Sequence, residues 1–245
     1  KQIPVQFAII DDMWADVPHL KEIPPETGFS DMVREMHKSP LRSFEGDPVR
    51  FPDGMKHTVE ALKEVGIRNV GIWFPTTGYW FGVEQGSGME REFADDLCTA
   101  PDGRRIVKPE LPHTVHWFGA LCGKAKAWGA DFVKIDNQGC QHFYREIGAI
   151  GEIARAVQTG IETAVAEHFG GAVINCMGMP SECMFNRLDS AVSRCSDDFM
   201  PENREWFTKN ILQCAYNGIL QGQFYVNDWD MWWTDDGQAE KNSLC

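Results

Sequence analysis

The segment that decides the fold reads Gly129-Ala130-Asp131-Phe132-Val133-Lys134-Ile135-Asp136-Asn137-Gln138. Its apolar run consists of residues that favour β-strands, and it ends in two charged residues, Lys134 and Asp136. Because side chains alternate between the faces of a strand, both charges point to the face opposite Ile135. An apolar strand with a charge pair at its carboxyl end is typical of parallel barrels, whose catalytic groups lie there. Taken alone, the segment favours a strand-end salt bridge without a chemical role, and the other strands change that interpretation.

The same pattern recurs along the chain: every predicted strand is an apolar run that ends in polar or aromatic residues. Including the segment above, the predicted strands cover residues 5–10, 70–74, 131–136, 172–177, 191–198 and 223–230. Predicted helices cover residues 54–65, 113–128, 146–169 and 201–217, with at most a short helix at 181–186. Strands that alternate with helices form parallel βα units.

Parallel βα units form either a doubly wound sheet or a barrel. The dinucleotide fingerprint and the phosphate-binding loop are both absent from the chain. Polar strand ends would gather near one switch point in a doubly wound sheet, whereas in a barrel they converge on one mouth. The pattern therefore predicts an α/β fold, a (β/α)8 TIM barrel, of which residues 1–245 carry about six of the eight βα units. We expect this catalytic barrel domain to be incomplete at both ends, and the long connections 15–53 and 76–112 to form a lid or wall over a site.

Composition narrows the class of ligand. The chain has 36 acidic and 23 basic residues, a formal net charge of -13, which opposes binding to nucleic acid or to an anionic membrane. No apolar run approaches the roughly 20 residues that span a bilayer. Eight cysteines lack the spacing of a zinc site, so we expect no metal and no cofactor. A neutral partner such as a sugar suits this charge. A homo-oligomer remains open, and so does the compartment, with the cytoplasm favoured.

The predicted strand ends would bring carboxylates, two cations and three tryptophans to one mouth. Carboxylates accept hydrogen bonds from sugar hydroxyls, and indole rings pack on the apolar face of a pyranose. Cleavage of a glycosidic bond needs one carboxyl as nucleophile and one as proton donor. A cation at Lys134 would keep Asp136 ionised, as a nucleophile requires, and crowding of Asp197 and Asp198 would raise one pKa, as a general acid requires.

Five segments resemble, in order, the motifs of glycoside hydrolase family 36, in particular its raffinose synthase/seed-imbibition-like group of α-galactosidases. They read Ile10-Asp11-Asp12-Met13-Trp14, Phe132-Val133-Lys134-Ile135-Asp136, Ile174-Asn175-Cys176-Met177, Arg194-Cys195-Ser196-Asp197-Asp198-Phe199 and Asp228-Trp229-Asp230-Met231. The resemblance extends from residue 5 to about residue 238. It implies a retaining glycosidase that removes terminal α-galactosyl residues from oligosaccharides through a covalent glycosyl-enzyme intermediate.

The resemblance also implies roles for individual residues. Asp136 matches the nucleophile, and Asp198 or Asp197 matches the acid/base, with Asp198 preferred because it lies four residues beyond Arg194. The Asp11-Asp12 pair would read the axial O4 of galactose. The candidate substrate-binding residues are Asp11, Asp12, Trp14, Trp73, Lys134, Asn175, Cys176, Arg194, Trp229 and Asp230. Each candidate also has an alternative role. The acidic pair could be an N-cap, and the three tryptophans could pack in the core. Cys176 could be an inert thiol, and Asp230 could support the mouth structurally.

The sequence departs from the family pattern in three ways. The family's first barrel strand is expected before Lys1, and the last βα unit with the C-terminal β-domain after Cys245. Met13 stands where glycine is more usual, which would reshape the sugar subsite. Two alternatives to the glycosidase therefore stay open. One is an α-galactosyltransferase of the raffinose synthase type, and the other is a catalytically silent, sugar-binding barrel fragment.

Overall fold

One parallel sheet organises the chain. The structure, a computed structural model, describes residues 4–18 and 29–231. In this part of the chain six strands lie in the order β1-β4-β7-β8-β9-β10, and every neighbouring pair is parallel. The strands are β1 (Phe7–Ile10), β4 (Asn69–Pro75), β7 (Phe132–Asp136), β8 (Val173–Asn175), β9 (Val192–Arg194) and β10 (Val226–Asp228). All six predicted strands are therefore present, most of them shorter than predicted.

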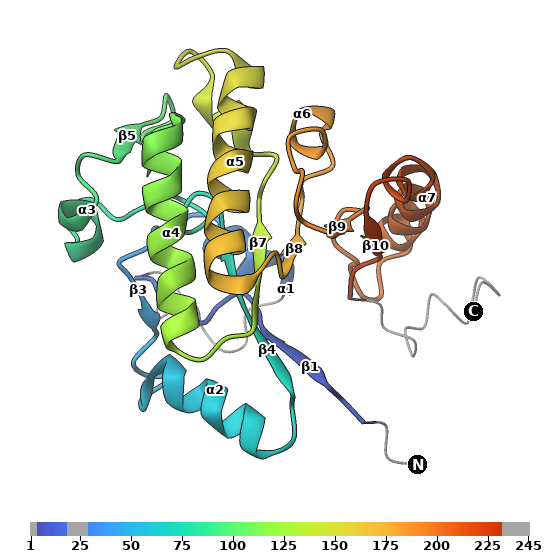
Figure 1. Cartoon of the computed structure of the whole chain (residues 1–245), viewed down its shortest axis with the longest axis horizontal. Coiled ribbons are helices and arrows are strands. Elements are labelled where there is room, and N and C mark those ends of the chain that lie inside the picture. The colour runs from blue at the N-terminus through green and yellow to red at the C-terminus, as the bar shows by residue number, and fades with distance from the viewer. Residues whose placement is uncertain (1–3, 19–28, 232–245) are drawn as a thin grey trace.

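The connecting helices cover the outer face of this sheet. They are α2 (Gly54–Glu64), α4 (Leu111–Ala127), α5 (Ile150–Phe169), α6 (Ser181–Met184) and α7 (Arg204–Gln221). Helices α4 and α5 lie side by side over the sheet, whereas α7 stands beside β9 and β10 at the far end (Figure 1). No helix in the described residues is long and apolar enough to cross a membrane.

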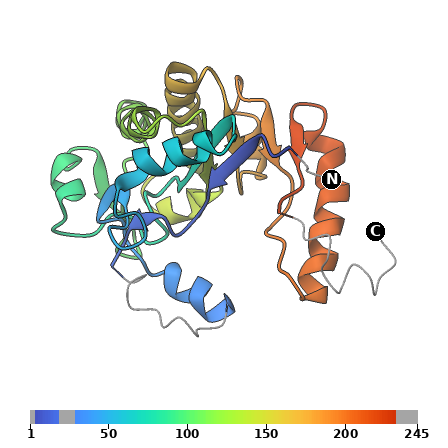
Figure 2. The same cartoon turned by 90° about the horizontal axis from the view of Figure 1, so that it is seen from below.

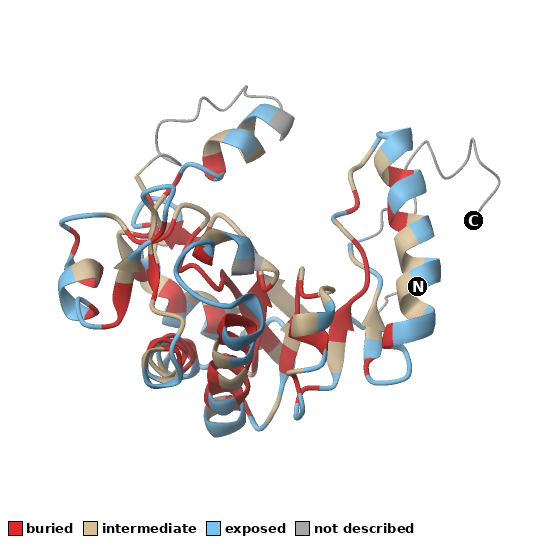
Figure 3. Cartoon of the chain, turned by 90° about the horizontal axis from the view of Figure 1, so that it is seen from above, coloured by how far each residue is buried: buried red, intermediate tan, exposed pale blue. Residues whose placement is uncertain are grey.

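A single glycine sets the close approach of α4 and α5. A Cβ atom on Gly160 would lie 2.6 Å from the Thr114 side chain, closer than real Cβ contacts allow. The hydroxyl of Thr114 donates to the carbonyl of Ala156 at 2.8 Å, which joins the two helices directly. The buried core lies between these helices and the sheet, whereas much of α7 and of the loops is exposed (Figure 3).

Two helices begin later than predicted, for reasons visible in the backbone. Helix α5 starts at Ile150 because Glu146 has φ +73°, outside the right-handed helical region. Helix α7 starts at Arg204, because Glu202 has φ +58° and the side chain of Asn203 accepts a hydrogen bond from Trp206 N as an N-cap.

The two long connections contain regular structure that the sequence did not reveal. The first holds β2 (Ala15–Asp16), α1 (Phe29–Met36) and β3 (Ser43–Gly46), with β2 and β3 antiparallel. The second holds α3 (Gly88–Glu92) and an antiparallel pair, β5 (Leu97–Thr99) and β6 (Arg105–Val107). A 3-10 turn, η2 (Cys140–Tyr144), follows β7. Helix α1 lies on the side of the sheet away from α4 and α5 (Figure 2).

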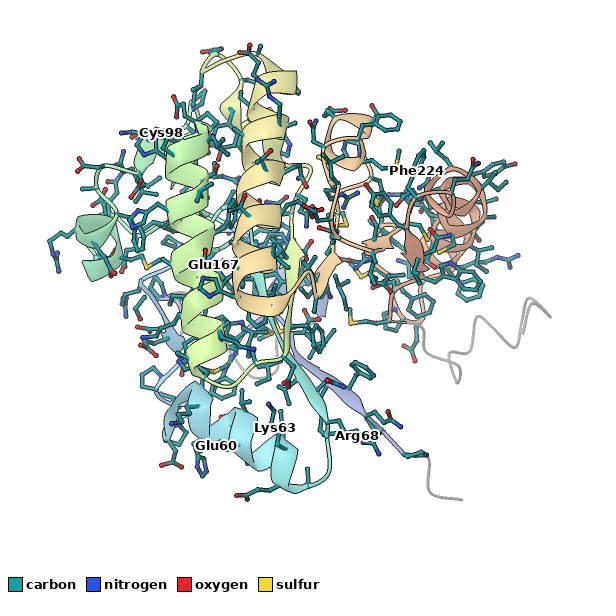
Figure 4. All side chains as sticks on the ribbon, viewed as in Figure 1. Glu60, Lys63, Arg68, Cys98, Glu167 and Phe224 are labelled. Atoms are coloured by element: carbon teal, nitrogen blue, oxygen red, sulfur yellow. The ribbon has the colours of Figure 1, made fainter. Side chains whose placement is uncertain are left out.

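The two ends of β7 have different surroundings. At its amino end, the Lys63 ammonium of α2 pairs with Asp131 at 3.0 Å and donates to the carbonyl of Gly129 at 2.7 Å (Lys63 is labelled in Figure 4). Asp131 also accepts from the backbone N–H of Val70 at 2.9 Å. These contacts fasten α2, β4 and β7 together, as expected at the end of a barrel where side chains contribute stability rather than chemistry.

Candidate active site

The carboxyl ends of the strands meet around a hollow of about 240 Å³. Six of the predicted site residues line it together, which are Asp11, Asp12, Trp73, Lys134, Asp136 and Asp198. The remaining lining residues are Met13, Met32, Val33, Met36, His37, Trp80 and Met231. Segments more than a hundred residues apart in the sequence thus deliver acidic, cationic and indole groups to one place.

Asp136 ends β7 at the base of this hollow and is buried. Its Oδ2 accepts a hydrogen bond from Trp73 Nε1 at 3.0 Å, and its Oδ1 accepts from the backbone N–H of Asn137 at 2.6 Å. The carboxylate is held by one donor from the neighbouring strand β4 and one from the turn after β7, which fixes its orientation toward the hollow.

Lys134 forms its ion pair with Asp11, not with Asp136 as the spacing suggested. Its Nζ lies 2.8 Å from Asp11 Oδ2, and the ammonium is almost fully buried. Burial lowers the pKa of Lys134, but the negative charges around it, among them Asp11 and Asp136, raise that pKa above its usual value. Lys134 is therefore a fixed cation that bridges the ends of β1 and β7.

Asp12 is held by aromatic donors that come from the connection after β4. Tyr79 OH donates to Oδ1 at 2.6 Å and Trp80 Nε1 donates to Oδ2 at 2.7 Å, while the backbone N–H of Met13 also reaches Oδ1. Burial raises the pKa of Asp12 to about 6, although these hydrogen bonds lower it in part. The alternative role as an N-cap does not apply, because strand β2 follows rather than a helix.

A buried guanidinium organises the other side of the hollow. Arg194, at the end of β9, pairs with Asp198 at 2.5 Å and with Asp230 at 2.9 Å. It also donates to the sulfur of Cys176 at 3.3 Å. Burial raises the pKa of the Cys176 thiol, and Asp136 is close enough for its carboxylate to raise that pKa further. Asp136 and Asp198 are thus joined by a short chain of contacts through Cys176 and Arg194.

The structure separates the two neighbouring acids that the sequence could not distinguish. Asp198 is half exposed and lines the hollow. Asp197 turns toward α7, where it pairs with Lys209 at 2.5 Å and accepts from Gln213 Nε2 at 3.0 Å. Burial alone would raise the pKa of Asp197, but these two partners lower it overall. The expected mutual repulsion does not occur, because the two side chains have different partners.

Comparison with known proteins now identifies the family. The family model described as raffinose synthase or seed imbibition protein Sip1 matches residues 93–243. The chain belongs to this family. Among curated relatives, probable galactinol–sucrose galactosyltransferase 6 of Arabidopsis thaliana is 29% identical over 265 residues, covering 97% of this chain and 34% of the relative. The galactinol–sucrose galactosyltransferase of Pisum sativum is 24% identical and covers 97% of this chain and 35% of the relative. The chain spans about a third of the length of these relatives.

Solved structures confirm the fold of this raffinose synthase family member. The α-galactosidase TtGalA from Thermus thermophilus, in complex with stachyose, aligns with a TM-score of 0.61 at 18% identity, over 98% of this chain and 51% of that one. The α-galactosidase I from Mortierella vinacea aligns with a TM-score of 0.52 at 18% identity, over 95% of this chain and 51% of that one. The described sheet and helices are therefore part of an α/β barrel, and both the predicted family and the predicted fold class are confirmed.

Several predicted site residues of this family member lie away from the hollow. Trp14 is 2% exposed, packs edge-on against Phe44 and Trp128, and donates its indole N–H to the carbonyl of Trp73. It has no free face for a sugar, so the core-packing interpretation holds for its ring. Trp229 is exposed but does not line the hollow.

The remaining predicted residues are buried behind the lining. Asn175 accepts from Gln138 and donates to Ser190 and to the carbonyl of Val192. Asp230 pairs with Arg194 and accepts from the backbone N–H of Phe199. Cys176 is fully buried, and burial raises its pKa well above the usual value. These three side chains, like Arg194, hold the residues of the hollow in place.

Sequence reasoning missed the residues that the two long connections contribute. Tyr79 and Trp80 hold Asp12, and α1 supplies a wall with His37 at its end. The adjacent aromatic pair in a glycine-rich loop directly after a strand was an available signal for the first two. His37 carried no such signal, because nothing in the spacing of residues 15–53 relates it to a strand end. Within the described residues, no group of three or more His, Cys, Asp and Glu could hold a metal ion.

Proposed function

We propose that the protein transfers α-galactosyl groups from a donor glycoside with retention of configuration, using Asp136 as nucleophile and Asp198 as acid/base. The observation that carries the proposal is that these two carboxyls line one sugar-sized hollow from different strand ends and are linked through Cys176 and Arg194. Asp136 is oriented by hydrogen-bond donors, whereas Asp198 is half exposed, where a leaving oxygen could reach it.

The proposed reaction has two steps, formation and breakdown of a covalent galactosyl-enzyme intermediate. In the first, an Asp136 oxygen bonds to the anomeric carbon, the bond from that carbon to the leaving oxygen breaks, and the leaving oxygen takes the proton of Asp198. In the second, the Asp198 carboxylate takes a proton from water or from an acceptor hydroxyl. The oxygen so freed bonds to the anomeric carbon and releases the Asp136 carboxylate.

Charged groups beside the nucleophile would hold the galactosyl hydroxyls. Lys134 and Asp11 form a fixed donor and acceptor pair next to Asp136. Asp12, with a pKa of about 6, offers a carboxyl that is partly protonated near neutral pH and can then donate as well as accept. These three groups are our proposed readers of the hydroxyls, among them the axial O4.

Transfer to a sugar is the specific form of the reaction that the relatives favour, because their names describe galactosyltransferases that use galactinol and sucrose. Hydrolysis uses the same intermediate with water in place of the acceptor, and loop geometry decides between them. A test is to supply galactinol with and without sucrose and to separate the products. A trisaccharide supports transfer and free galactose supports hydrolysis. If neither forms while galactose still binds, the protein is a silent sugar-binding barrel and the proposal is wrong.

The nucleophile can be tested directly. A fluorinated α-galactosyl fluoride slows the second step and allows the covalent intermediate to accumulate. Mass spectrometry of a protease digest should find the added galactosyl mass on the peptide that contains Asp136. The mass should be absent from the same peptide in the Asp136→Asn variant. Label on another acidic peptide would overturn the assignment.

A further inference from the structure

One wall of the hollow comes from outside the βα units of the barrel. Helix α1 belongs to the connection between β1 and α2, and Figure 2 shows it on the side of the sheet away from α4 and α5. Met32, Val33, Met36 and His37 from this segment line the hollow opposite the charged groups. The hollow therefore has two chemically different sides. The strand ends supply carboxylates and one cation, Lys134, whereas the α1 segment supplies thioether and aliphatic groups with a single imidazole.

The imidazole of His37 rests on a tryptophan that is fixed on several sides. The His37 and Trp80 rings are tilted by 37° with their centroids 4.6 Å apart. Trp80 donates its indole N–H to Asp12 and accepts from Arg104 Nη1 at its backbone carbonyl at 3.0 Å. Its ring also lies 5.6 Å from that of Trp73. The Trp80 ring cannot move without breaking these contacts, so it is a rigid support for His37.

The nitrogens of His37 are available to a ligand. Within residues 4–18 and 29–231, no hydrogen bond to them is found, and the side chain is exposed toward the hollow. Burial and the cation of Arg104 lower the pKa of His37, whereas the carboxylates of Asp198 and, more weakly, Asp136 raise it. With the overall shift downward, the imidazole is neutral near pH 7. A neutral imidazole has one donor and one acceptor nitrogen, which matches the two capacities of a sugar hydroxyl.

The surroundings of His37 indicate which part of the substrate its imidazole faces. His37 lines the hollow together with the half-exposed acid/base Asp198, and it comes from the α1 segment rather than from the strand ends that carry Lys134 and Asp136. The acid/base contacts the oxygen that leaves in the first step and the oxygen that attacks in the second. A group beside it therefore faces the leaving group and the acceptor rather than the galactosyl ring.

We propose that His37, supported by Trp80 and flanked by the thioethers of α1, forms the subsite for the leaving group and for a neutral sugar acceptor. The imidazole would hydrogen-bond a hydroxyl, and the side chains of Met32 and Met36 would pack on the C–H groups of the same sugar. This inference rests on the proposed function, because a subsite for an acceptor has meaning only in an enzyme that transfers galactose.

Two substitutions separate the hydrogen bond from the packing. His37→Phe keeps an aromatic ring on Trp80 but removes both nitrogens, and His37→Ala removes ring and nitrogens together. His57→Ala, an exposed histidine on α2 far from the hollow, is the matched control. Each variant is assayed with 4-nitrophenyl α-galactoside as donor and sucrose as acceptor, following nitrophenol release and the transfer product separately.

The hydrogen-bond assignment predicts that the apparent KM for sucrose rises about tenfold in both His37 variants, the factor that corresponds to about 1.4 kcal/mol. Nitrophenol release without acceptor should fall by a much smaller factor, because a nitrophenolate needs little help to leave. His57→Ala should match the wild type in both readouts.

The contrary outcomes are distinct. A wild-type KM for sucrose in His37→Phe, with or without an effect of His37→Ala, would reduce the role of His37 to packing and overturn the inference while the enzyme stays active. A wild-type protein that releases no nitrophenol would overturn the proposed function and this inference with it.

Discussion

Positive backbone φ angles occur at both ends of the strands, but different residues adopt them. Before the strands, glycines take these angles, at Gly66 (φ +103°) ahead of β4, Gly129 (φ +92°) ahead of β7 and Gly171 (φ +90°) ahead of β8. After four of the strands, residues with side chains take them, which are Met13 after β1, Asn137 after β7, Met177 after β8 and Asp230 after β10, with φ between +52° and +75°, whereas β4 is followed by Gly78 (φ +90°). Only glycine adopts this region without steric cost.

The difference shows where the fold accepts strain. The amino ends carry turns without strain and structural contacts such as Lys63 with Asp131. The carboxyl ends hold Met13 in a costly conformation directly beside Asp12, and Asn137, a residue type that tolerates this region better, adopts it beside Asp136. Strain of this kind persists only where surrounding contacts enforce it, and it gathers at functional sites. The comparison thus supports the assignment of the carboxyl ends to chemistry.

The largest contrast should be between the two carboxylates of β7. Asp136→Asn should lower galactosyl transfer about 10⁴-fold or more, because the amide cannot form the covalent intermediate. Asp131→Asn should leave turnover within twofold but lower the free energy of unfolding by about 1 kcal/mol, since it weakens the partly exposed pair with Lys63. Kinetics on an aryl α-galactoside and urea unfolding of both variants provide the measurements. Equal effects of the two substitutions on turnover would remove the distinction between the ends.

The second contrast lies within the Asp197-Asp198 pair. Asp198→Asn should slow turnover about 10²–10³-fold with a sugar leaving group, because proton donation is lost, and much less with a nitrophenyl leaving group. Asp197→Asn should change both by less than threefold, since that side chain contacts Lys209 and Gln213 instead of the hollow. Comparing the two donors for each variant separates proton donation from a general loss of structure. A leaving-group effect in Asp197→Asn would transfer the acid/base role to that residue.

A third prediction concerns the buried acid at the end of β1. The pKa of Asp12 is raised from 3.8 to about 6 in the folded protein, mainly by burial. The unfolded chain therefore loses this proton at lower pH than the folded one. The stabilising contribution is complete below pH 4 and is lost as the pH rises to about 6. Allowing for partial solvent screening, the loss is about 1–2 kcal/mol.

The Asp12 prediction is checked by urea unfolding at intervals between pH 3.5 and 7. The wild type should lose stability over that window relative to Asp12→Asn, which has no proton to release there. Parallel curves for the two proteins would show that Asp12 has the same pKa in the folded and the unfolded chain. Asp12 would then be ionised near neutral pH, and the partly protonated carboxyl would be removed from the proposed sugar site.

The sequence predicted the barrel and the acidic strand ends because both depend on local patterns. The apolar run of β7 ending at Asp136 and the motif around Arg194 are visible in the chain itself. The contribution of His37 was not predictable, because it depends on how the connection 15–53 folds back over the sheet. Trp80 carried a signal, the aromatic pair directly after a strand, but its partner Asp12 is distant in sequence. The predicted ion-pair partner of Lys134 was wrong for a related reason. Its actual partner, Asp11, is distant in sequence and comes near Lys134 only because β1 and β7 both pair with β4. Likewise Asp197 and Asp198 became distinguishable only when α7 supplied Lys209.

The smallest effect tests the strain itself. Met13 has φ +75° and also lines the hollow, so a substitution there changes stability both through the backbone and through the lost side chain. Met13→Ala and Met13→Gly remove the same thioether and differ mainly in the backbone. The glycine variant should be more stable to urea than the alanine variant by about 1 kcal/mol, because glycine adopts this φ without steric cost.

At the amino ends of the strands, a glycine should likewise be more stable to urea than an alanine at the same position. Gly129→Ala places a Cβ atom 3.6 Å from Val59, an ordinary contact, so its cost is the backbone alone, again about 1 kcal/mol. Equal stability of the two Met13 variants alongside a destabilised Gly129→Ala would mean that the turn after β1 relaxes without strain. The left-handed residues beyond the strands would then reflect turn geometry alone, and the functional assignment of the carboxyl ends would rest on Asp136 and Asp198 without support from the backbone.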